Sequence, residues 1–189
     1  MIPHTNYLMR TQNWNAMRVL FGTIVLSLVI ATTAWAEGTA EDNLKQKNIT
    51  LPGPSRAVGN YVPAVRTGNL LFLSACGPGL GPSAPRGKVG KDVSLDQAYQ
   101  AARATGLILL ATVRAEIGSL DKVKRIVKVF GMVNSAPGFT DQTKVINGFS
   151  DLMVEVFGDK IGGHARAAVG MAELPFNIPV NIEMVVEVE

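Results

Sequence analysis

A capped, alanine-rich helical segment between strand-like segments is the feature that most constrains the fold of this chain. Ser94 and Gln97 fit a capping box, in which the serine caps the helix and the glutamine reaches back to the cap. Small and apolar residues then recur at three- and four-residue steps up to Gly118, which predicts one amphipathic helix. Its many alanines would allow it to lie close to a sheet.

A second apolar stripe predicts a helix over residues 140–157 that ends at Gly158. Five further segments have strand patterns, and the last alternates strictly between apolar and mostly polar residues. These segments are residues 57–64, 69–76, 122–134, a strand that contains Arg166, and 180–188. The order β-β-α-β-α-β-β predicts an α+β class, a two-layer fold with both helices on one face of a mixed sheet.

The second face of that sheet also has apolar character. Residues 69–76 and 167–172 carry apolar side chains at successive positions, which indicates strands covered on both faces. Since the chain has no further helices to supply the cover, we expect another copy of the protein to pack there.

The first 36 residues have the pattern of an export signal. Arg10 and Arg18 precede an uncharged run of 18 residues that ends in "AWA", the small-x-small pattern of a signal-peptidase site. An uncleaved membrane anchor is the alternative, because about 20 residues span a bilayer. We predict a cleaved signal peptide over residues 1–36, a polar and loosely held segment over 37–50, one domain over 51–189, and a periplasmic or secreted location without membrane contact.

Charge and composition exclude some classes of site. Removal of Arg10 and Arg18 with the leader lowers the net charge from +3 to +1, which gives no clustered positive charge for nucleic acid. Cys76 is the single cysteine, so no internal disulfide is possible, and we expect it to be a small buried residue. His164 has no second histidine near it, so we expect no metal site.

One arginine has an unusual setting. Arg166 stands at the entrance of the small, apolar segment "ARAAVGM", although a guanidinium stays charged at any physiological pH. It either binds an anionic ligand or forms an ion pair with Glu155, Asp159 or a C-terminal glutamate.

Several segments together resemble a known family. They are "VGNYVPAVRTGNLLFLSACGP", "DVSLDQAYQAARATGLILLATVRAEIGSLDKVKRIVKVFGMV", "INGF" and "HARAAVGMAELPFNIPVNIEMVVEVE". In order and spacing they resemble the RidA family, also called the YjgF family, over residues 44–189, and most of all its longer bacterial branch. The resemblance implies a chorismate-mutase-like fold, a homotrimer with sites between subunits, and hydrolysis of 2-imino acids or enamines to 2-keto acids and ammonia without cofactor or metal.

The resemblance also implies roles for four residues that match the family motifs. Arg166 matches the arginine that grips the substrate carboxylate, and Tyr61 in "VGNY" matches the tyrosine that lines the pocket. Ser74 in "LSACGP" and Asn147 in "VINGF" match two further substrate-binding positions. Each has a purely structural alternative: a half-buried aromatic for Tyr61, a turn hydrogen bond for Ser74 and a polar cap at a subunit contact for Asn147.

Two positions depart from the family pattern. Ala168 stands where family members commonly have a cysteine. The change is mild, because in the family the backbone groups of this residue do much of the work. Asn181 stands where the family has a glutamate thought to position or activate the attacking water. Glu183 lies two residues further along the same strand face and could substitute.

The resemblance thus implies an enzyme of the imine deaminase type, with Arg166 and Asn181 as its catalytic residues. An asparagine can orient a water molecule but cannot take its proton. A non-catalytic binder of small carboxylates on the same scaffold is therefore the alternative. A ribonuclease or translation inhibitor is a third possibility, against which the low net charge of the mature chain argues.

Overall fold

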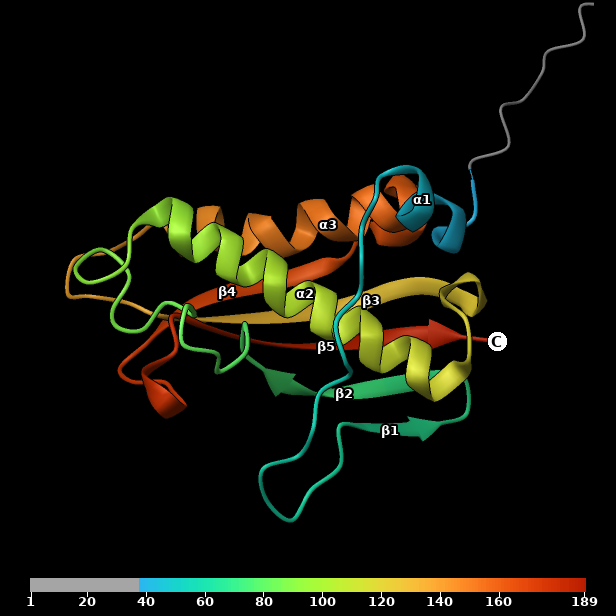
Figure 1. The fold of residues 1–189 in the computed structure, drawn as a ribbon, viewed down its shortest axis with the longest axis horizontal. Coiled ribbons are helices and arrows are strands. Elements are labelled where there is room, and N and C mark those ends of the chain that lie inside the picture. Colours follow the sequence, from blue (N-terminus) through green and yellow to red (C-terminus); the bar gives the residue numbers. More distant parts are fainter. Residues whose placement is uncertain (1–37) are drawn as a thin grey trace, which may run out of the picture. The chain divides into compact units, whose positions relative to one another are not determined.

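A five-stranded mixed sheet carries two long helices on one of its faces (Figure 1). The structure is a computed structural model that describes residues 38–189, so the predicted signal peptide lies outside the described residues. The strand order is β1-β2-β5-β3-β4, in which β3 and β4 run parallel and the other neighbours run antiparallel. The strands are β1 (Ala64–Thr67), β2 (Leu70–Cys76), β3 (Val123–Asn134), β4 (Ala165–Met171) and β5 (Val180–Val188).

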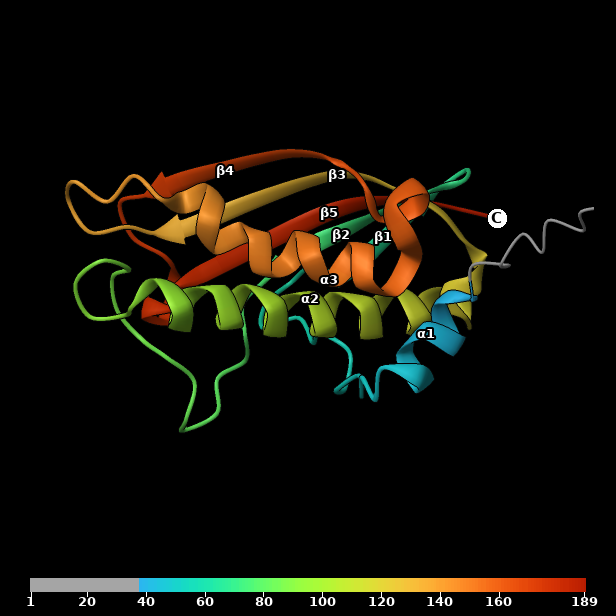
Figure 2. The ribbon, with the colours of Figure 1, turned by 90° about the horizontal axis from the view of Figure 1, so that it is seen from above.

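The two predicted helices lie side by side on that face as α2 (Leu95–Ile117) and α3 (Gln142–Gly162) (Figure 2). The predicted capping box is present, since Ser94 Oγ accepts from Gln97 N and Gln97 Oε1 accepts from Ser94 N. The helix α2 ends at Gly118, whose φ of 85° suits a glycine. Gly158 interrupts α3 with a φ of 72°, close to the predicted end, and a further turn follows it.

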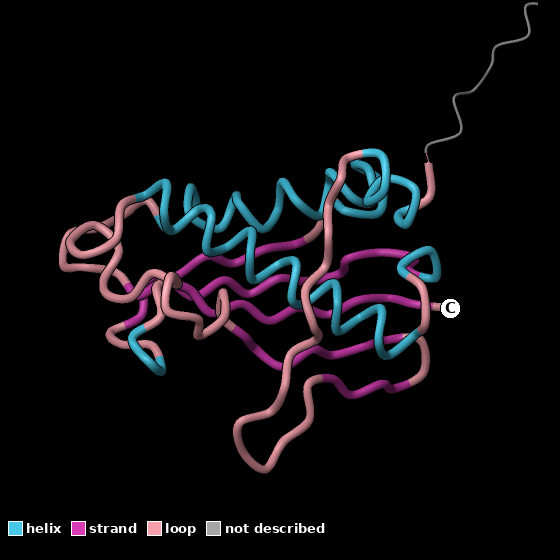
Figure 3. Tube along the Cα trace, in the orientation of Figure 1, coloured by secondary structure: helices cyan, strands magenta, loops and turns pink. Residues whose placement is uncertain are grey.

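The predicted two-layer α+β class and the order of its elements are confirmed, and Figure 3 shows the helical layer against the strands. The predicted strand over residues 57–64 is wrong, because β1 begins only at Ala64. Pro63 has no N–H for a ladder, and the preceding residues form bends instead. The hairpin turn is Gly68–Asn69, and the φ of 58° at Gly68 explains why glycine occupies it.

The core lies between the helical layer and the sheet. The apolar face of β5 is buried as its alternation predicts, at Val180, Ile182, Met184, Val186 and Val188. Phe149, Ile146 and Leu109 of the helices belong to the same core cluster and are fully buried. Burial of each such side chain stabilises the fold by about 1.5–3 kcal/mol, so this contact holds the two layers together. Within residues 38–189, no helix is long and apolar enough to cross a membrane.

The opposite face of the sheet stays open in the single chain. Val65 and Phe72 are neighbours across β1 and β2, and they are 55% and 44% exposed. Val185 of β5 continues the row beside Phe72. The continuous apolar run in residues 70–73 thus contributes Leu71 and Leu73 to the core and Phe72 to the open face.

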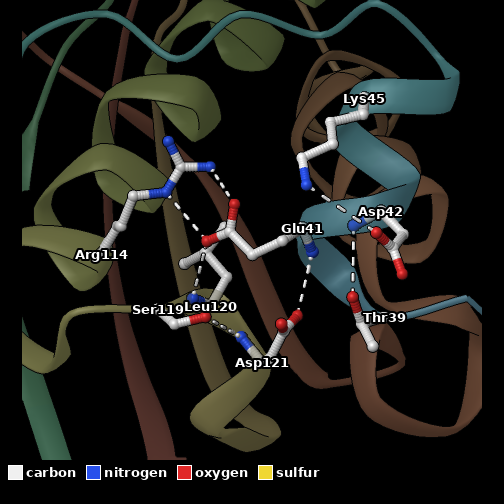
Figure 4. A network of polar contacts seen from close by, with 8 residues as sticks. All are labelled: Thr39, Glu41, Asp42, Lys45, Arg114, Ser119, Leu120 and Asp121. Atoms are coloured by element: carbon white, nitrogen blue, oxygen red, sulfur yellow. Dashed lines mark hydrogen bonds and ion pairs between the residues drawn. The ribbon is translucent and has the colours of Figure 1, made fainter.

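The N-terminal segment differs from the loosely held start that its polar composition predicted. Residues Ala40–Gln46 form a helix, α1, which packs on α3 and on the short turn η2 (Leu120–Lys122). Glu41 is its main anchor, because its carboxylate accepts from Arg114 Nε at 3.0 Å, Arg114 Nη2 at 2.6 Å and Leu120 N at 3.0 Å (Figure 4). Composition did not reveal these partners because they lie more than 70 residues away in sequence.

We expect Glu41→Ala to destabilise the fold by about 1–3 kcal/mol, because it leaves the partly buried Arg114 fork and the Leu120 N–H without their acceptor. Urea unfolding followed by circular dichroism measures the change. Lys45→Ala is the matched control on the same helix, since its pair with Asp42 is long and exposed and should contribute less than about 0.5 kcal/mol. Equal effects of the two changes would contradict the anchoring role of Glu41.

Candidate functional site

Arg166 lies on β4 with its guanidinium against α3. The parallel register places it beside the fully buried Val129, so its side chain points to the helical face of the sheet. Its Nη1 donates to Asn147 Oδ1 at 3.0 Å and to Ser150 Oγ at 2.9 Å. The structure therefore brings together two of the residues that the sequence singled out, Arg166 and Asn147, in a half-buried position.

The guanidinium has no acidic partner within residues 38–189. Glu155, one of the predicted alternatives, pairs with Arg103 at 2.6 Å, and Glu189 pairs with Lys124 at 2.7 Å. Asp159 is exposed and forms no ion pair with Arg166 in this part of the chain. Nε and Nη2 of Arg166 donate no hydrogen bond to any described residue, so one edge of the guanidinium is available for an anion.

The close approach of α3 to the sheet is what places Asn147 and Ser150 within reach of β4. A Cβ on Gly131 would lie 2.6 Å from Ile146 Cγ1, so a larger residue would force α3 away. Gly148 is as restricted, since a Cβ there would lie 2.1 Å from Tyr99 O of α2. Ala168 lies beside Gly131 in the register and packs on the core, so any contribution it makes to a ligand comes from its backbone.

A second group of predicted residues lines a cavity of about 380 Å³. Tyr61, 48% exposed, and Asn181 face it together with Cys76 and Phe176. The Oδ1 of Asn181 is buried and accepts no hydrogen bond within the described part of the chain. A buried acceptor without a partner is costly, so a water molecule or a ligand donor would be stabilised at this position.

Ser74 and Glu183 belong to a different hollow, on the open face of the sheet. They line a cavity of about 250 Å³ with Phe72 and Phe130. The Oγ of Ser74 donates to Val62 O at 2.7 Å, a structural hydrogen bond to the segment before β1 and not to the turn at "SACGP". Glu183 shares its strand face with Asn181 but does not line the cavity of Asn181.

The predicted residues thus form three groups that one chain does not join: Arg166 with Asn147, Tyr61 with Asn181, and Ser74 with Glu183. Arg166 and Asn147 lie at β4, one edge of the sheet, whereas Tyr61 precedes β1 at the other edge (Figure 1). Asn181, on the central strand β5, is grouped with Tyr61.

Ser150 and His164 complete the surroundings of Arg166, and sequence reasoning gave neither a functional role. His164 Nε2 lies 3.0 Å from Ser150 Oγ, and its Nδ1 lies 2.6 Å from Gly162 O. Two signals were present: Ser150 follows Asn147 by three residues on a helix, and His164 precedes Arg166 by two residues at the start of a strand.

Two other kinds of site, a reactive thiol and a metal centre, can be checked within residues 38–189. Burial raises the pKa of the Cys76 thiol to about 12, so it is a poor nucleophile at neutral pH. Residues 38–189 contain no cluster of three histidine, cysteine, aspartate or glutamate side chains that could hold a metal ion.

Comparison with known proteins identifies the class that this fold and these residues define. Residues 41–188 match the family described as "YjgF/chorismate_mutase-like, putative endoribonuclease". Protein TCP17 of Trypanosoma cruzi is 40% identical over 154 residues, which are 80% of this chain and 96% of that protein. The chain therefore belongs to the YjgF/RidA family, as its sequence motifs predicted.

Two solved structures are similar over most of their length. Atu1372 of Agrobacterium tumefaciens, a protein of unknown function, is 44% identical with a TM-score of 0.71, over 79% of this chain and 92% of that one. A Shewanella oneidensis protein described as a "putative endoribonuclease" is 29% identical with a TM-score of 0.76, over 80% of this chain and all of that one. Their architecture agrees with the two-layer fold described above.

We expect the Cys76 thiol to resist alkylation in the folded protein. A rise in its pKa from 9.0 to about 12 lowers the thiolate fraction near pH 8 by about 1000-fold. Iodoacetamide labelling followed by mass spectrometry should therefore be slow in the native protein and fast in urea. Cys76 is only partly buried, not fully buried as the sequence predicted, and rapid labelling of the native protein at this pH would contradict its assignment as an unreactive residue.

Proposed function

We propose that this protein hydrolyses reactive 2-imino acids, or the enamines in equilibrium with them, to 2-keto acids and ammonia. Water adds to the carbon of the C=N bond, and the C–N bond of the resulting carbinolamine breaks. The nitrogen leaves as ammonia after it gains protons from the water and the medium, and the oxygen stays as the keto group. No electron acceptor is needed, because the reaction is a hydrolysis.

The half-buried Arg166, which has no acidic partner among residues 38–189, is the observation that carries this proposal. Two neutral oxygens, from Asn147 and Ser150, hold its Nη1 and leave the Nε and Nη2 edge unoccupied. Such an edge presents two parallel N–H donors and matches a carboxylate bidentately. A carboxylate held in this way fixes the adjacent imine carbon, and orientation alone can lower the barrier by several kcal/mol.

A second copy of the chain would complete the site. The Arg166 group and the Tyr61 group belong to separate elements of one chain, and a cleft between copies can bring one of each together. The open apolar sheet face at Val65 and Phe72 gives those copies a surface on which to associate. We propose a homotrimer with one such cleft at each subunit contact, in a periplasmic or secreted location as the leader sequence indicates.

Asn181 would orient the attacking water in this site. Its Oδ1 is a buried acceptor without a partner among the described residues, so it can accept a hydrogen bond from a water proton. It cannot take that proton, and general-base assistance commonly contributes about 10²–10⁴-fold to a rate. Catalysis in this chain would therefore depend on the binding of the substrate carboxylate by Arg166 and on the orientation of the water by Asn181.

Asn181 also favours a second candidate, a non-catalytic binder of small carboxylates. A site that keeps Arg166 and lacks a base retains binding and loses much of the rate advantage. The endoribonuclease description of the family and of the Shewanella protein is a third candidate. Against it stands the net charge of +1 expected after signal cleavage, which provides little excess positive charge to neutralise phosphates. RNA affinity depends on such phosphate contacts.

We expect Arg166→Ala to lower the rate of ammonia release from a freshly generated 2-imino acid by about 100-fold or more, because the carboxylate loses its bidentate partner. Arg166→Lys should recover little, since an ammonium keeps the charge but not the planar pair of donors. Ammonia release in a coupled assay is the measurement. Lys91→Ala is the control, because Lys91 is an exposed cation in the loop before α2 and should leave the rate unchanged.

Full activity of Arg166→Ala would show that the carboxylate grip is misassigned. Binding of pyruvate in calorimetry without any turnover of imine would favour the binder instead, and Asn181→Glu would then be the variant that gains activity. Cleavage of RNA by the pure protein, without imine turnover and without pyruvate binding, would favour the endoribonuclease.

We expect light scattering to give three times the subunit mass, and Phe72→Lys to shift the protein towards monomer, because it places a charge on the open apolar face. Ala115→Lys is the matched control, since Ala115 is exposed on α2, which packs on the other face of the sheet. A wild-type monomer would contradict the shared site.

A further inference from the structure

The hydrogen bonds that link Arg166 to Ser150, His164 and Gly162 form a chain in which each group donates to the next. Gly162 O can only accept, so the His164 Nδ1 at 2.6 Å must carry the proton. In a neutral ring Nε2 is then an acceptor, and the Ser150 hydroxyl at 3.0 Å donates to it. With its proton so engaged, Ser150 Oγ directs its lone pairs elsewhere and accepts from Arg166 Nη1 at 2.9 Å. The order of donation is Arg166, Ser150, His164, Gly162.

The surroundings of His164 keep the ring neutral. Its ring meets the edge of the fully buried Phe149 at a centroid distance of 6.0 Å and an interplanar angle of 80°. Burial lowers the pKa of His164 below 6.5; the hydrogen bond to the Gly162 carbonyl opposes this in part, and the charge of Arg166 makes a smaller lowering contribution. The donation order therefore holds at neutral pH.

We propose that Ser150 and His164 are positioning residues for Arg166, which fix the plane of its guanidinium so that the Nε and Nη2 edge faces the carboxylate of the substrate. This inference rests on the proposed function, and it assigns two residues that the family resemblance did not supply. Asn147 alone would leave Nη1 with one contact, about which the guanidinium could still turn. The second contact removes that freedom before the ligand arrives, which lowers the entropic cost of binding.

Acidification should release the guanidinium of Arg166 from this fixed orientation. Once His164 is protonated, both ring nitrogens donate, so Ser150 Oγ must accept from two cations and the hydroxyl proton loses its acceptor. No nearby acid offsets this within residues 38–189. On α3, Asp151 accepts from Tyr99 and Glu155 pairs with Arg103.

The remaining charged groups near the ring are exposed. Asp159 and Lys160 lie at the end of α3, and Lys128 of β3 lies beside Ala165 in the register. Arg166 is the charged group among the described residues that acts on the pKa of His164. We therefore expect the hold on Arg166 to loosen as the pH falls through the lowered pKa of His164, below 6.5.

Pyruvate binding to the full-length protein tests this inference, measured by calorimetry from about pH 7.5 down to about pH 4.5. We expect wild-type affinity to fall about tenfold on acidification. His164→Gln keeps a neutral acceptor for Ser150, so its affinity should stay near the wild-type value and should not change with pH. His164→Ala and Ser150→Ala should bind about tenfold more weakly at neutral pH, and Ser150→Thr, which keeps the hydroxyl, should restore binding.

A ligand-free measurement separates failure of this inference from failure of the proposed function. In nitrogen-15 NMR spectra, His164 should show the Nδ1–H form, and His164→Gln distinguishes its signals from those of His4. The Arg166 Nε–H signal should be sharp at neutral pH and should broaden in Ser150→Ala, in His164→Ala and on acidification of the wild type.

If wild-type protein binds no pyruvate, the proposed function is wrong, and these spectra alone decide whether Arg166 is positioned in this way. An Nε2–H form of His164 would overturn the inference, as would an Arg166 signal unaffected by both alanine variants. A pH dependence of pyruvate binding in His164→Gln equal to that of the wild type would overturn it too.

Discussion

The contact of α3 with the sheet at Gly131 is the constraint on which the candidate site depends. Without a Cβ at this position, Ile146 can lie against the strand, and α3 comes close enough for its polar residues to reach β4. The same contact closes the core around Phe149. Packing and site geometry are therefore coupled, because any residue that separated the two layers would also withdraw Asn147 and Ser150 from Arg166.

Most of the architecture could be predicted from the sequence because it depends on local patterns. The capping box of Ser94 and Gln97, the break at Gly158 and the alternation of β5 each act within a few residues, and each appears in the structure. The two failures have different causes, a long-range contact in one case and a local one in the other. The helix α1 looked like a loose polar segment because Glu41 finds its partners on α2 and η2, and the predicted first strand overlooked the missing N–H of Pro63.

The candidate site could be predicted only in part, for a related reason. Family motifs indicated Arg166 and Asn147, and the structure brings them together. His164 looked like an isolated histidine because its partners, Ser150 and the Gly162 carbonyl, become visible only when the end of α3 and the start of β4 are placed. The separation of Tyr61 from Arg166 follows from strand order, which depends on pairing between distant segments and not on residue type.

The docking of α1 has a consequence for the order of folding. Asn43 Nδ2 donates to Val156 O at 2.8 Å, a contact between residues 113 apart in sequence. During synthesis α1 therefore has no complete docking surface until most of the chain has left the ribosome, and contacts of such separation are slow to form. Any cellular factor that binds α1 itself can thus reach this helix before it docks.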